Sequence, residues 1–280
     1  MRSYDQLVSD ARRFLKPLAW KLRRGDESSN LGFILGSQRS GTNMLNDAFD
    51  RDWNCMAFGE DGGLALGPSY EHDLRWRWRP LDQVQDVFES LQAPLIIAKP
   101  IVESQRALEL LSFFPRSKII WAYRDYRDVA QSSIALFGAD SSLHNLRAVL
   151  DPKMRAHWFS QNLSDESRDL VRRFFDPGRP LADLKLLGWL VRNSLYFQLQ
   201  LDRNPRVAIS RYENLVRSPV VEMTRLYAFL GASFPGPQVC RHMHRDSLRK
   251  GRDAEVSADV EKLCRDLLER LHGACARAGA

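Results

Sequence analysis

The stretch Leu31-Gly32-Phe33-Ile34-Leu35-Gly36-Ser37-Gln38-Arg39-Ser40-Gly41-Thr42-Asn43 decides the fold of this chain. It opens with a short apolar run, which is typical of a strand buried on both faces, and residues 44–49 follow with helical spacing. Gly36 and Gly41 frame a loop of the G-x-x-x-x-G type, which presents backbone N–H groups to a phosphate at a helix N-terminus. The sequence therefore predicts a strand, an anion-binding loop and a helix, in that order.

The rest of the chain repeats this alternation of strand and helix. Apolar runs predict strands at residues 95–98, 118–123 and 206–210, and helical patterns occupy residues 103–114, 127–137 and 184–201. We therefore expect an α/β fold with a P-loop-type, mostly parallel sheet flanked by helices. Residues 138–180 turn polar and contain two Asp-Pro pairs, so we expect an inserted, partly helical and irregular lid over the active edge of the sheet.

Length and composition indicate one folded domain over residues 1–280. Of the 280 residues, 44% are hydrophobic and 27% charged, which supports a core and argues against disorder. The formal charge of +6 suits a polyanionic partner, such as a nucleotide, a nucleic acid or an anionic membrane surface, without choosing among them. Four scattered cysteines without metal-ligand spacing are expected to be reduced thiols.

Residues 1–30 are expected to form a basic N-terminal helix and a linker. Within them, residues 4–24 have an apolar side and many arginines and lysines elsewhere, so this helix either docks on its own domain or makes peripheral membrane contact. The first residues are charged and reach no apolar run long enough for a signal peptide or a membrane span. A cytoplasmic location is therefore expected.

Two side-chain patterns narrow the kind of anion. A nucleoside-triphosphate loop would continue after Gly41 with Lys and then Ser or Thr, whereas here Thr42 and Asn43 follow and the cation, Arg39, lies inside the loop. Further on, Arg124 ends the strand at 118–123 and Ser132 follows in the next helix, so a guanidinium fork and a hydroxyl donor can meet one anion. Both features count against an ATPase or a kinase.

Both segments resemble motifs of the sulfotransferases that depend on 3′-phosphoadenosine 5′-phosphosulfate (PAPS). Residues 33–43 resemble the family's 5′-phosphosulfate loop, with Gln38 in place of its proline and Asn43 in place of its second threonine. The segment from Arg124 to Ser132 resembles the family's 3′-phosphate motif. Residues 211–219 resemble its Arg-Tyr-Glu-Asp-Leu segment, and residues 249–251 resemble the start of its Arg-Lys-Gly-x-x-Gly loop, although Ala254 replaces the second glycine.

The resemblance implies PAPS as co-substrate, PAP as product and no metal. It assigns donor binding to the loop, to the 3′-phosphate motif and to the two later segments, namely to Gln38, Arg39, Ser40, Gly41, Thr42, Asn43, Arg124, Ser132, Tyr212, Arg249 and Lys250. The neighbouring charges Asp125, Arg127 and Asp128 are better explained as residues that cap and stabilise the start of a helix.

Sulfuryl transfer also needs a cation at the leaving oxygen and a base for the acceptor hydroxyl. Arg39 is the first candidate cation, and Lys99 is the second because it ends the strand at 95–98, where a lysine also stands in tyrosylprotein sulfotransferases. Residues 58–61 resemble the Cys-Gly-Glu-Glu segment of that group, which makes Glu60 the candidate base. The alternative bases are three histidines, since many cytosolic sulfotransferases use one: His72, His144 and His157.

The acceptor is expected to be a compound with a free hydroxyl: a small molecule such as a phenol, a glycan, a lipid-linked compound or a peptide. Residues 75–80, Arg-Trp-Arg-Trp-Arg-Pro, interleave cations with aromatic faces, which suits an acceptor site or a surface covered by amphipathic side chains. Trp189 and Tyr196 are expected in the core. Two other functions remain open: a P-loop nucleotide kinase or NTPase, and a non-catalytic binder of nucleic acid or anionic membranes. The sequence predicts no nucleic-acid partner and leaves the oligomeric state open.

Overall fold

One parallel sheet organises the chain. The computed structural model describes residues 14–18, 20, 29–60, 63–71, 74–138, 140–244 and 255–279. Within these residues the strands are β1 (Asn30–Gly36), β2 (Cys55–Phe58), β3 (Leu95–Ala98), β4 (Lys118–Tyr123) and β5 (Val207–Arg211). They lie in the order β2-β3-β1-β4-β5, and every neighbouring pair is parallel. The predicted α/β fold with a mostly parallel sheet is confirmed.

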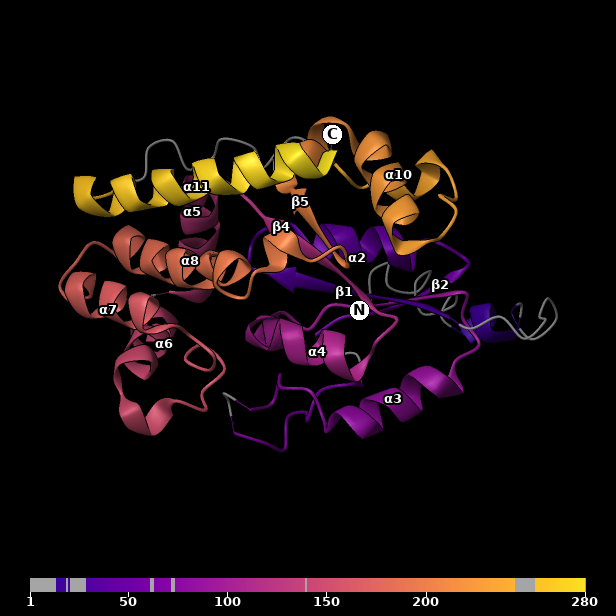
Figure 1. Cartoon of the computed structure of the whole chain (residues 1–280), viewed down its shortest axis with the longest axis horizontal. Helices are drawn as coiled ribbons and strands as arrows, with labels where there is room; N and C mark the ends of the chain where they lie inside the picture. The colour runs from indigo at the N-terminus through magenta and orange to yellow at the C-terminus, as the bar shows by residue number, and fades with distance from the viewer. Residues whose placement is uncertain are drawn as a thin grey trace.

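Helices connect the strands and cover both faces of the sheet (Figure 1). The α-helices are α2 (Thr42–Asp50), α3 (Leu81–Ser90), α4 (Ala107–Phe113), α5 (Tyr126–Phe137), α6 (Asp140–Leu150), α7 (Asp165–Phe174), α8 (Leu181–Gln198), α9 (Tyr212–Arg217), α10 (Pro219–Leu230) and α11 (Ala258–Gly279). Short 3₁₀ turns are η1 (Ile101–Arg106), η2 (Pro152–Met154), η3 (Leu201–Arg203) and η4 (Pro237–Cys240).

Alternate residues of the strands enter two separate cores. Phe33 and Trp121 point to one face, where they pack with residues of α3, α4, α8 and α11. Ile34 and Ile120 point to the other face and pack with α2 and α10. Figure 1 shows α2 and α10 on one side of the strands and α3 and α4 on the other. Because both faces are covered, the strands read as continuous apolar runs rather than as alternating ones. Trp189 and Tyr196 are buried in the first core, as predicted.

Three details of the secondary structure add to or refine the prediction. The strand β2 was not predicted, because its four residues, Cys-Met-Ala-Phe, are too few to distinguish a strand pattern from a chance run of apolar residues. Residues 138–180 are largely helical, since they form α6, η2 and α7. The Asp-Pro pairs separate these helices: the Asp151 carboxylate accepts from the N–H of Lys153 at the start of η2, and Asp176 follows the end of α7. A helix expected from residue 103 instead begins as the 3₁₀ turn η1.

The described residues near the N-terminus contact the edge of the sheet. Lys16 Nζ donates to the carbonyl oxygens of Asp50 at 2.6 Å and Cys55 at 2.8 Å, and Trp20 Nε1 donates to Trp53 O at 2.8 Å. The remainder of the expected helix at 4–24 lies outside the described residues. In the described ranges no helix is long and apolar enough to cross a membrane. Membrane contact and the cytoplasmic location stay predictions. All four cysteines are free thiols, as expected from the sequence.

Candidate active site

The loop after β1 is anchored at its first residue. Gly36 has φ 130°, and a Cβ atom added there would lie 2.2 Å from Ala122 O on β4, so no other residue fits. The N–H of Gly36 donates to Ser104 Oγ at 3.0 Å, and that hydroxyl donates to Ile101 O at 2.8 Å. The base of the loop is therefore pinned between β4 and the turn η1.

The rest of the loop has the form of an anion cradle. Arg39 and Gly41 both adopt left-handed backbone conformations, with φ 64° and 81°, and such residues within a turn can direct successive N–H groups toward an anion. The Oγ of Ser40 is buried and has no hydrogen-bond partner among the described residues. The helix α2 starts at Thr42 with no side-chain cap and no acidic residue in its first turn. Unsatisfied donors at a helix N-terminus suit a bound phosphate or sulfate.

The arginine of the loop contacts the serine of the second predicted motif. Arg39 Nε donates to Ser132 Oγ at 2.9 Å, although the two residues are 93 positions apart in the sequence. Burial and the nearby charge of Arg124 lower the pKa of the Arg39 guanidinium. Arg39 and Arg124 are close enough for their charges to interact, and two such cations repel each other unless an anion lies between them. The geometry thus joins the two predicted anion-binding segments into one site.

Arg124 is held by two neighbours. It is buried at the end of β4, its NH2 group lies 3.3 Å from the carboxylate of Asp128, and its guanidinium lies 4.2 Å from the centre of the Tyr212 ring. That ring also packs on the loop, since a Cβ atom added to Gly41 would lie 2.3 Å from it. Tyr212 therefore stands beside both the loop and Arg124.

The other charged residues near Arg124 have structural partners. The Asp125 carboxylate caps α5 by accepting from the N–H of Arg127 at 2.9 Å, and Arg127 forms an ion pair with Glu261 of α11. Asp128 lies one helical turn after Arg124 and pairs with it, so its role goes beyond starting the helix. Arg249 and Lys250, predicted to bind the donor, lie outside the described residues, as does His72.

The candidate base and the second candidate cation form an ion pair. Lys99 Nζ lies 2.5 Å from Glu60 Oε1, and the lysine side chain is almost fully buried. Both residues follow neighbouring parallel strands, β3 and β2, and the N–H of Lys99 donates to Phe58 O at 3.0 Å. Carboxyl ends of parallel strands meet at one edge of a sheet, which is where ligands of such folds bind. The second oxygen of Glu60, Oε2, is the one left for a substrate.

A cleft of about 800 Å³ unites the loop, the candidate base and the inserted segment. Gln38, Arg39, Thr42 and Asn43 line its loop side, and Glu60 lies with them. The facing wall is formed by residues of α5, α6 and three further segments: Arg75, Trp76, Val102, Leu136, Phe137, Asp140, Ser141, His144, Asn145 and Trp158. His144 thus shares the cleft with Glu60, whereas His157 stands behind it, with its ring 5.2 Å from that of His144.

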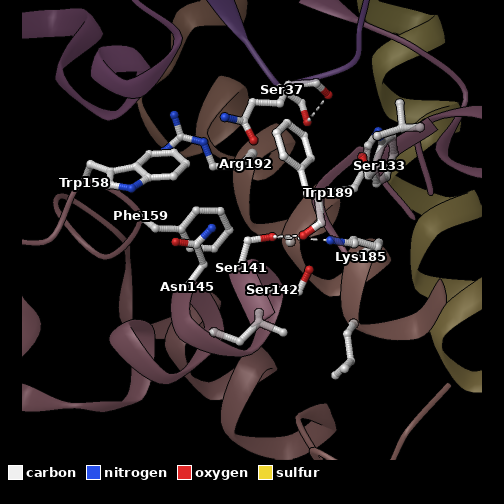
Figure 2. Close-up of a pocket in the computed structure, with 16 residues that line it drawn as sticks. Ser37, Ser133, Ser141, Ser142, Asn145, Trp158, Phe159, Lys185, Trp189 and Arg192 are labelled. Atoms are coloured by element: carbon white, nitrogen blue, oxygen red, sulfur yellow. Dashed lines mark hydrogen bonds between the residues drawn. The ribbon is translucent and has the colours of Figure 1, made fainter. Parts of the chain in front are cut away.

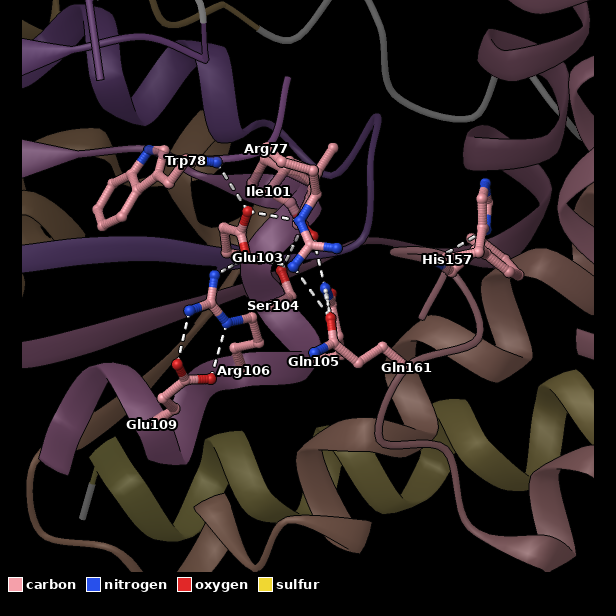
Figure 3. Close-up of polar contacts among 12 residues, drawn as sticks. Arg77, Trp78, Ile101, Glu103, Ser104, Gln105, Arg106, Glu109, His157 and Gln161 are labelled. Carbon is pink, nitrogen blue, oxygen red and sulfur yellow. Dashed lines mark hydrogen bonds and ion pairs between the residues drawn. The ribbon is translucent and has the colours of Figure 1, made fainter. Parts of the chain in front are cut away.

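The segment of alternating arginines and tryptophans divides between cleft and core. Arg75 and Trp76 line the cleft, whereas Trp78 is buried in the core and Arg77 binds the buried carboxylate of Glu103, Nε to Oε1 at 2.7 Å. Figure 3 shows Glu103 as the centre of this network, which also includes Arg106 at 2.8 Å and the N–H of Trp78 at 2.9 Å. Arg77 and Trp78 therefore anchor the segment, and Arg75 and Trp76 are the residues of it that face the cleft.

Comparison with known proteins identifies the family. Residues 32–265 match the family model described as the sulfotransferase domain. The chain belongs to the sulfotransferase domain family. This membership covers the loop, the Arg124–Ser132 pair and the inserted helices, and it supports sulfuryl transfer as the general activity.

Solved sulfotransferase domains share the fold. The sulfotransferase domain of the Synechococcus PCC 7002 olefin synthase is 16% identical, with a TM-score of 0.55 over 89% of this chain and 98% of that domain. The sulfotransferase domain of the curacin biosynthetic pathway is 15% identical, with a TM-score of 0.53 over 88% of this chain and 99% of that domain. A search of curated proteins found no match. At these identities the likeness concerns the fold.

Several residues of this sulfotransferase site carried no motif. Ser104, which pins the loop, and Phe137 and Trp158, which wall the cleft, reach the site from segments that are distant in sequence. Asp128 could have been found, because its spacing from Arg124 is that of an i,i+4 ion pair. In the part of the chain that the structure describes, no three His, Cys, Asp or Glu side chains are grouped to hold a metal ion, and the expectation of metal-free chemistry stays a prediction.

Proposed function

We propose that this chain transfers the sulfuryl group of PAPS to an acceptor hydroxyl of a small molecule, a glycan or a peptide. The observation that carries the proposal is the 2.9 Å hydrogen bond between Arg39 and Ser132, which brings the loop and the 3′-phosphate motif into contact. A donor with anions at both its 3′ and 5′ positions needs two such segments close together. An ordinary adenine nucleotide needs only one.

The chain offers a fitting group to each anion of that donor. The N–H groups from Gln38 to Asn43 and the buried hydroxyl of Ser40 would hold the 5′-phosphosulfate. Arg124, Ser132 and Tyr212 would hold the 3′-phosphate and the nucleoside beside it, and Arg249 and Lys250 would join them from outside the described residues. When bound, PAPS supplies the sulfuryl group, and PAP departs as the anion.

The residues around the cleft can then perform the transfer. Glu60 Oε2 would take the proton of the acceptor hydroxyl as the acceptor oxygen bonds to sulfur. The bond between sulfur and the bridging phosphate oxygen breaks, and Arg39 and Lys99 would stabilise the charge that grows on that oxygen. Because Lys99 binds Glu60 Oε1, it also aims the carboxylate into the cleft.

Binding of the product nucleotide tests the donor assignment. In a thermal-shift series with PAP, ADP and ATP, the proposal requires stabilisation by PAP well above the other two, since a ligand at 100 times its dissociation constant adds about 2.7 kcal/mol to stability. Equal shifts for the three nucleotides, or magnesium-dependent ATP turnover, would support the kinase alternative instead. Salt-sensitive binding to DNA or anionic vesicles that survives Arg39→Ala with Arg124→Ala would support the non-catalytic alternative.

A further inference from the structure

The cleft continues behind the loop into a small pocket of about 60 Å³ (Figure 2). Ser37 and Gln38 bound it on the loop side, and residues of α5, α6 and α8 form the rest of its wall together with Trp158 and Phe159. Phe137, Ser141, Asn145 and Trp158 line both the pocket and the cleft, so one opens into the other. One water needs about 10–15 Å³ of such volume, and the pocket therefore takes one compact group such as a carboxylate or a phosphate.

Two buried cations of α8 line this pocket. Lys185 and Arg192 are 8% and 4% exposed and lie two helical turns apart, on one face of the helix. Lys185 Nζ donates to the hydroxyl of Ser141 at 3.5 Å, and Figure 2 shows this contact across the pocket. Arg192 donates to Gln105 Oε1 at 3.2 Å and to Ile101 O at 3.0 Å, and its guanidinium lies 5.1 Å from the Trp158 ring.

No carboxylate compensates these charges inside the pocket. None of its described lining residues is acidic. The carboxylate that acts on Arg192 from outside is Glu103, which is already bonded to Arg77 and Arg106. Asp140 lines the cleft beside the pocket but not the pocket itself. Burial lowers the pKa of both Lys185 and Arg192, as expected for cations that leave water without an anionic partner.

The remaining polar groups of the pocket are those that bind anions. Four hydroxyls, from Ser37, Ser133, Ser141 and Ser142, and the amides of Gln38 and Asn145 stand around it. All of these groups can donate a hydrogen bond to an oxyanion. Buried cations surrounded by uncharged donors form a site for an oxyanion that the chain itself does not supply.

We propose that this pocket is the subsite for an anionic group of the acceptor, which makes the preferred acceptors hydroxyl compounds that carry a carboxylate or a phosphate. This inference rests on the proposed function. The anions of the donor have other partners, because Arg39, Arg124 and Ser132 do not line the pocket. An acceptor seated with its anion at Lys185 would run past Phe137 and Trp158 into the cleft that Glu60 lines.

Calorimetry on the PAP-saturated protein tests the subsite directly, because PAP occupies the anion sites of the donor. Inorganic phosphate and acetate serve as probes of the two oxyanion classes. At least one is expected to bind the wild type, to bind Lys185→Met at least 10-fold more weakly, and to bind Lys185→Arg with affinity close to wild type. Lys153→Met, which removes an exposed lysine elsewhere, is the matched control and should leave binding unchanged. Absence of binding by both probes, or equal binding to Lys185→Met, would overturn the proposal.

Turnover gives a second test that does not depend on small probes. With PAPS as donor, 3-(4-hydroxyphenyl)propanoate is compared with its uncharged methyl ester. The acid should have a kcat/KM at least 10-fold above that of the ester. Lys185→Met should raise the KM of the acid and so bring the acid-to-ester ratio of kcat/KM near one. A ratio that Lys185→Met leaves unchanged, or a preference for the ester, would contradict the subsite.

The stability of the variants separates this inference from a structural role and from the proposed function. Lys185→Met removes an uncompensated buried charge, so the Tm of the ligand-free protein should rise. A fall in Tm with unchanged anion binding would make Lys185 a structural residue and overturn the inference. Normal PAP binding without any anion preference would leave the proposed function intact and refute the subsite alone. Loss of PAP binding in the wild type would instead refute the proposed function.

Discussion

Lys99 Nζ and Glu60 Oε1 lie 2.5 Å apart, at the ends of two neighbouring parallel strands. The contact places the candidate base and a candidate leaving-group cation at one point of the cleft. Since Lys99 binds Oε1, Glu60 would meet the acceptor with Oε2, and loss of the lysine would release the carboxylate as well as remove a charge. The two residues therefore act as a unit, and the effects of changing them should not add.

Glu60→Gln tests the base. The amide cannot accept a proton, so kcat should fall by about 10²–10⁴-fold while the affinity for PAP stays near wild type. Glu71→Gln, at an exposed glutamate outside the cleft, is the control for loss of one carboxylate and should keep full activity. His144→Gln is the competing variant, because His144 lines the same cleft. Full activity in Glu60→Gln together with a large loss in His144→Gln would transfer the role to the histidine.

Arg124→Ala is expected to act on donor binding. Charge-assisted hydrogen bonds contribute about 1.5–3 kcal/mol, so the affinity for PAP should fall by about 10- to 100-fold. Asp128→Asn should weaken PAP binding less, since it removes only the carboxylate that lies 3.3 Å from Arg124. Calorimetry of the two single variants and the double variant measures the coupling. Additive losses would show that Asp128 does not position Arg124.

Two glycines with the same φ angle, one in the loop and one outside it, allow the cost of backbone strain to be distinguished from an effect on donor binding. Gly41 and Gly231 both have φ 81°. A Cβ atom added at Gly41 would lie 2.3 Å from the Tyr212 ring, whereas one added at Gly231 would lie 3.6 Å from its nearest neighbour, Asn30 Oδ1, which is an ordinary contact distance. Both changes to alanine carry the cost of a left-handed residue, about 1–2 kcal/mol. Only Gly41→Ala should also displace Tyr212 and lose PAP binding. Equal PAP affinities of the two variants would show that the contact between Gly41 and Tyr212 is not needed for donor binding.

The buried carboxylate of Glu103 should matter for stability and for the acceptor. Glu103→Ala leaves Arg77 without its bidentate partner, and removing one member of a buried ion pair costs about 3–5 kcal/mol. Because the segment that carries Arg75 and Trp76 is then loose, the acceptor KM should rise more than the PAP dissociation constant. Glu109→Ala, at the half-exposed partner of Arg106, should cost at most about 1 kcal/mol. Denaturant unfolding and steady-state kinetics check both statements.

Acid is expected to destabilise the fold through His272. Burial, with the charge of Arg211 added, lowers the pKa of this histidine on α11 below its ordinary value of about 6.5. The folded state therefore binds fewer protons than the unfolded chain, and stability is lost as pH falls through 6.5 toward the lower folded pKa. His272→Gln should lose less Tm than the wild type between pH 7.5 and 5, and the exposed His244→Gln should match the wild type. A change of 1 kcal/mol in stability shifts Tm by about 2–4 °C in a protein of this size, so the difference between the variant and the wild type is measurable.

Much of the fold was predictable because both faces of the sheet are covered. The runs that became β1, β3 and β4 are apolar throughout, and such runs between helical patterns admit few other readings. The strand β2 escaped because four residues carry too little pattern. The helices α6 and α7 were read as partly irregular because their polar faces and Asp-Pro breaks resemble loops, although Ser164 supplies an ordinary cap at the N–H of Ser167.

The site was predictable only where chemistry is concentrated in a short motif. The loop and Arg124 each follow the end of a strand, and Ser132 lies on the helix that follows Arg124, so the parallel topology brings the three together. Lys185 and Arg192 lie within a helix pattern that predicts burial, and nothing local distinguishes a buried cation from an exposed one. Their position depends on how α8 packs against α5 and α6, which is a property of the tertiary structure.

The most direct test of the account compares PAP with adenosine 5′-monophosphate, which differs from PAP only by the 3′-phosphate. Calorimetry should give PAP an affinity at least about 100-fold higher, or roughly 2.7 kcal/mol, for two charge-assisted contacts from Arg124 and its neighbours. Arg124→Ala should bring the two affinities close together by weakening PAP alone. Equal affinities of the wild type for the two nucleotides would contradict the assignment of Arg124 and Ser132, and with it the identification of PAPS as the donor.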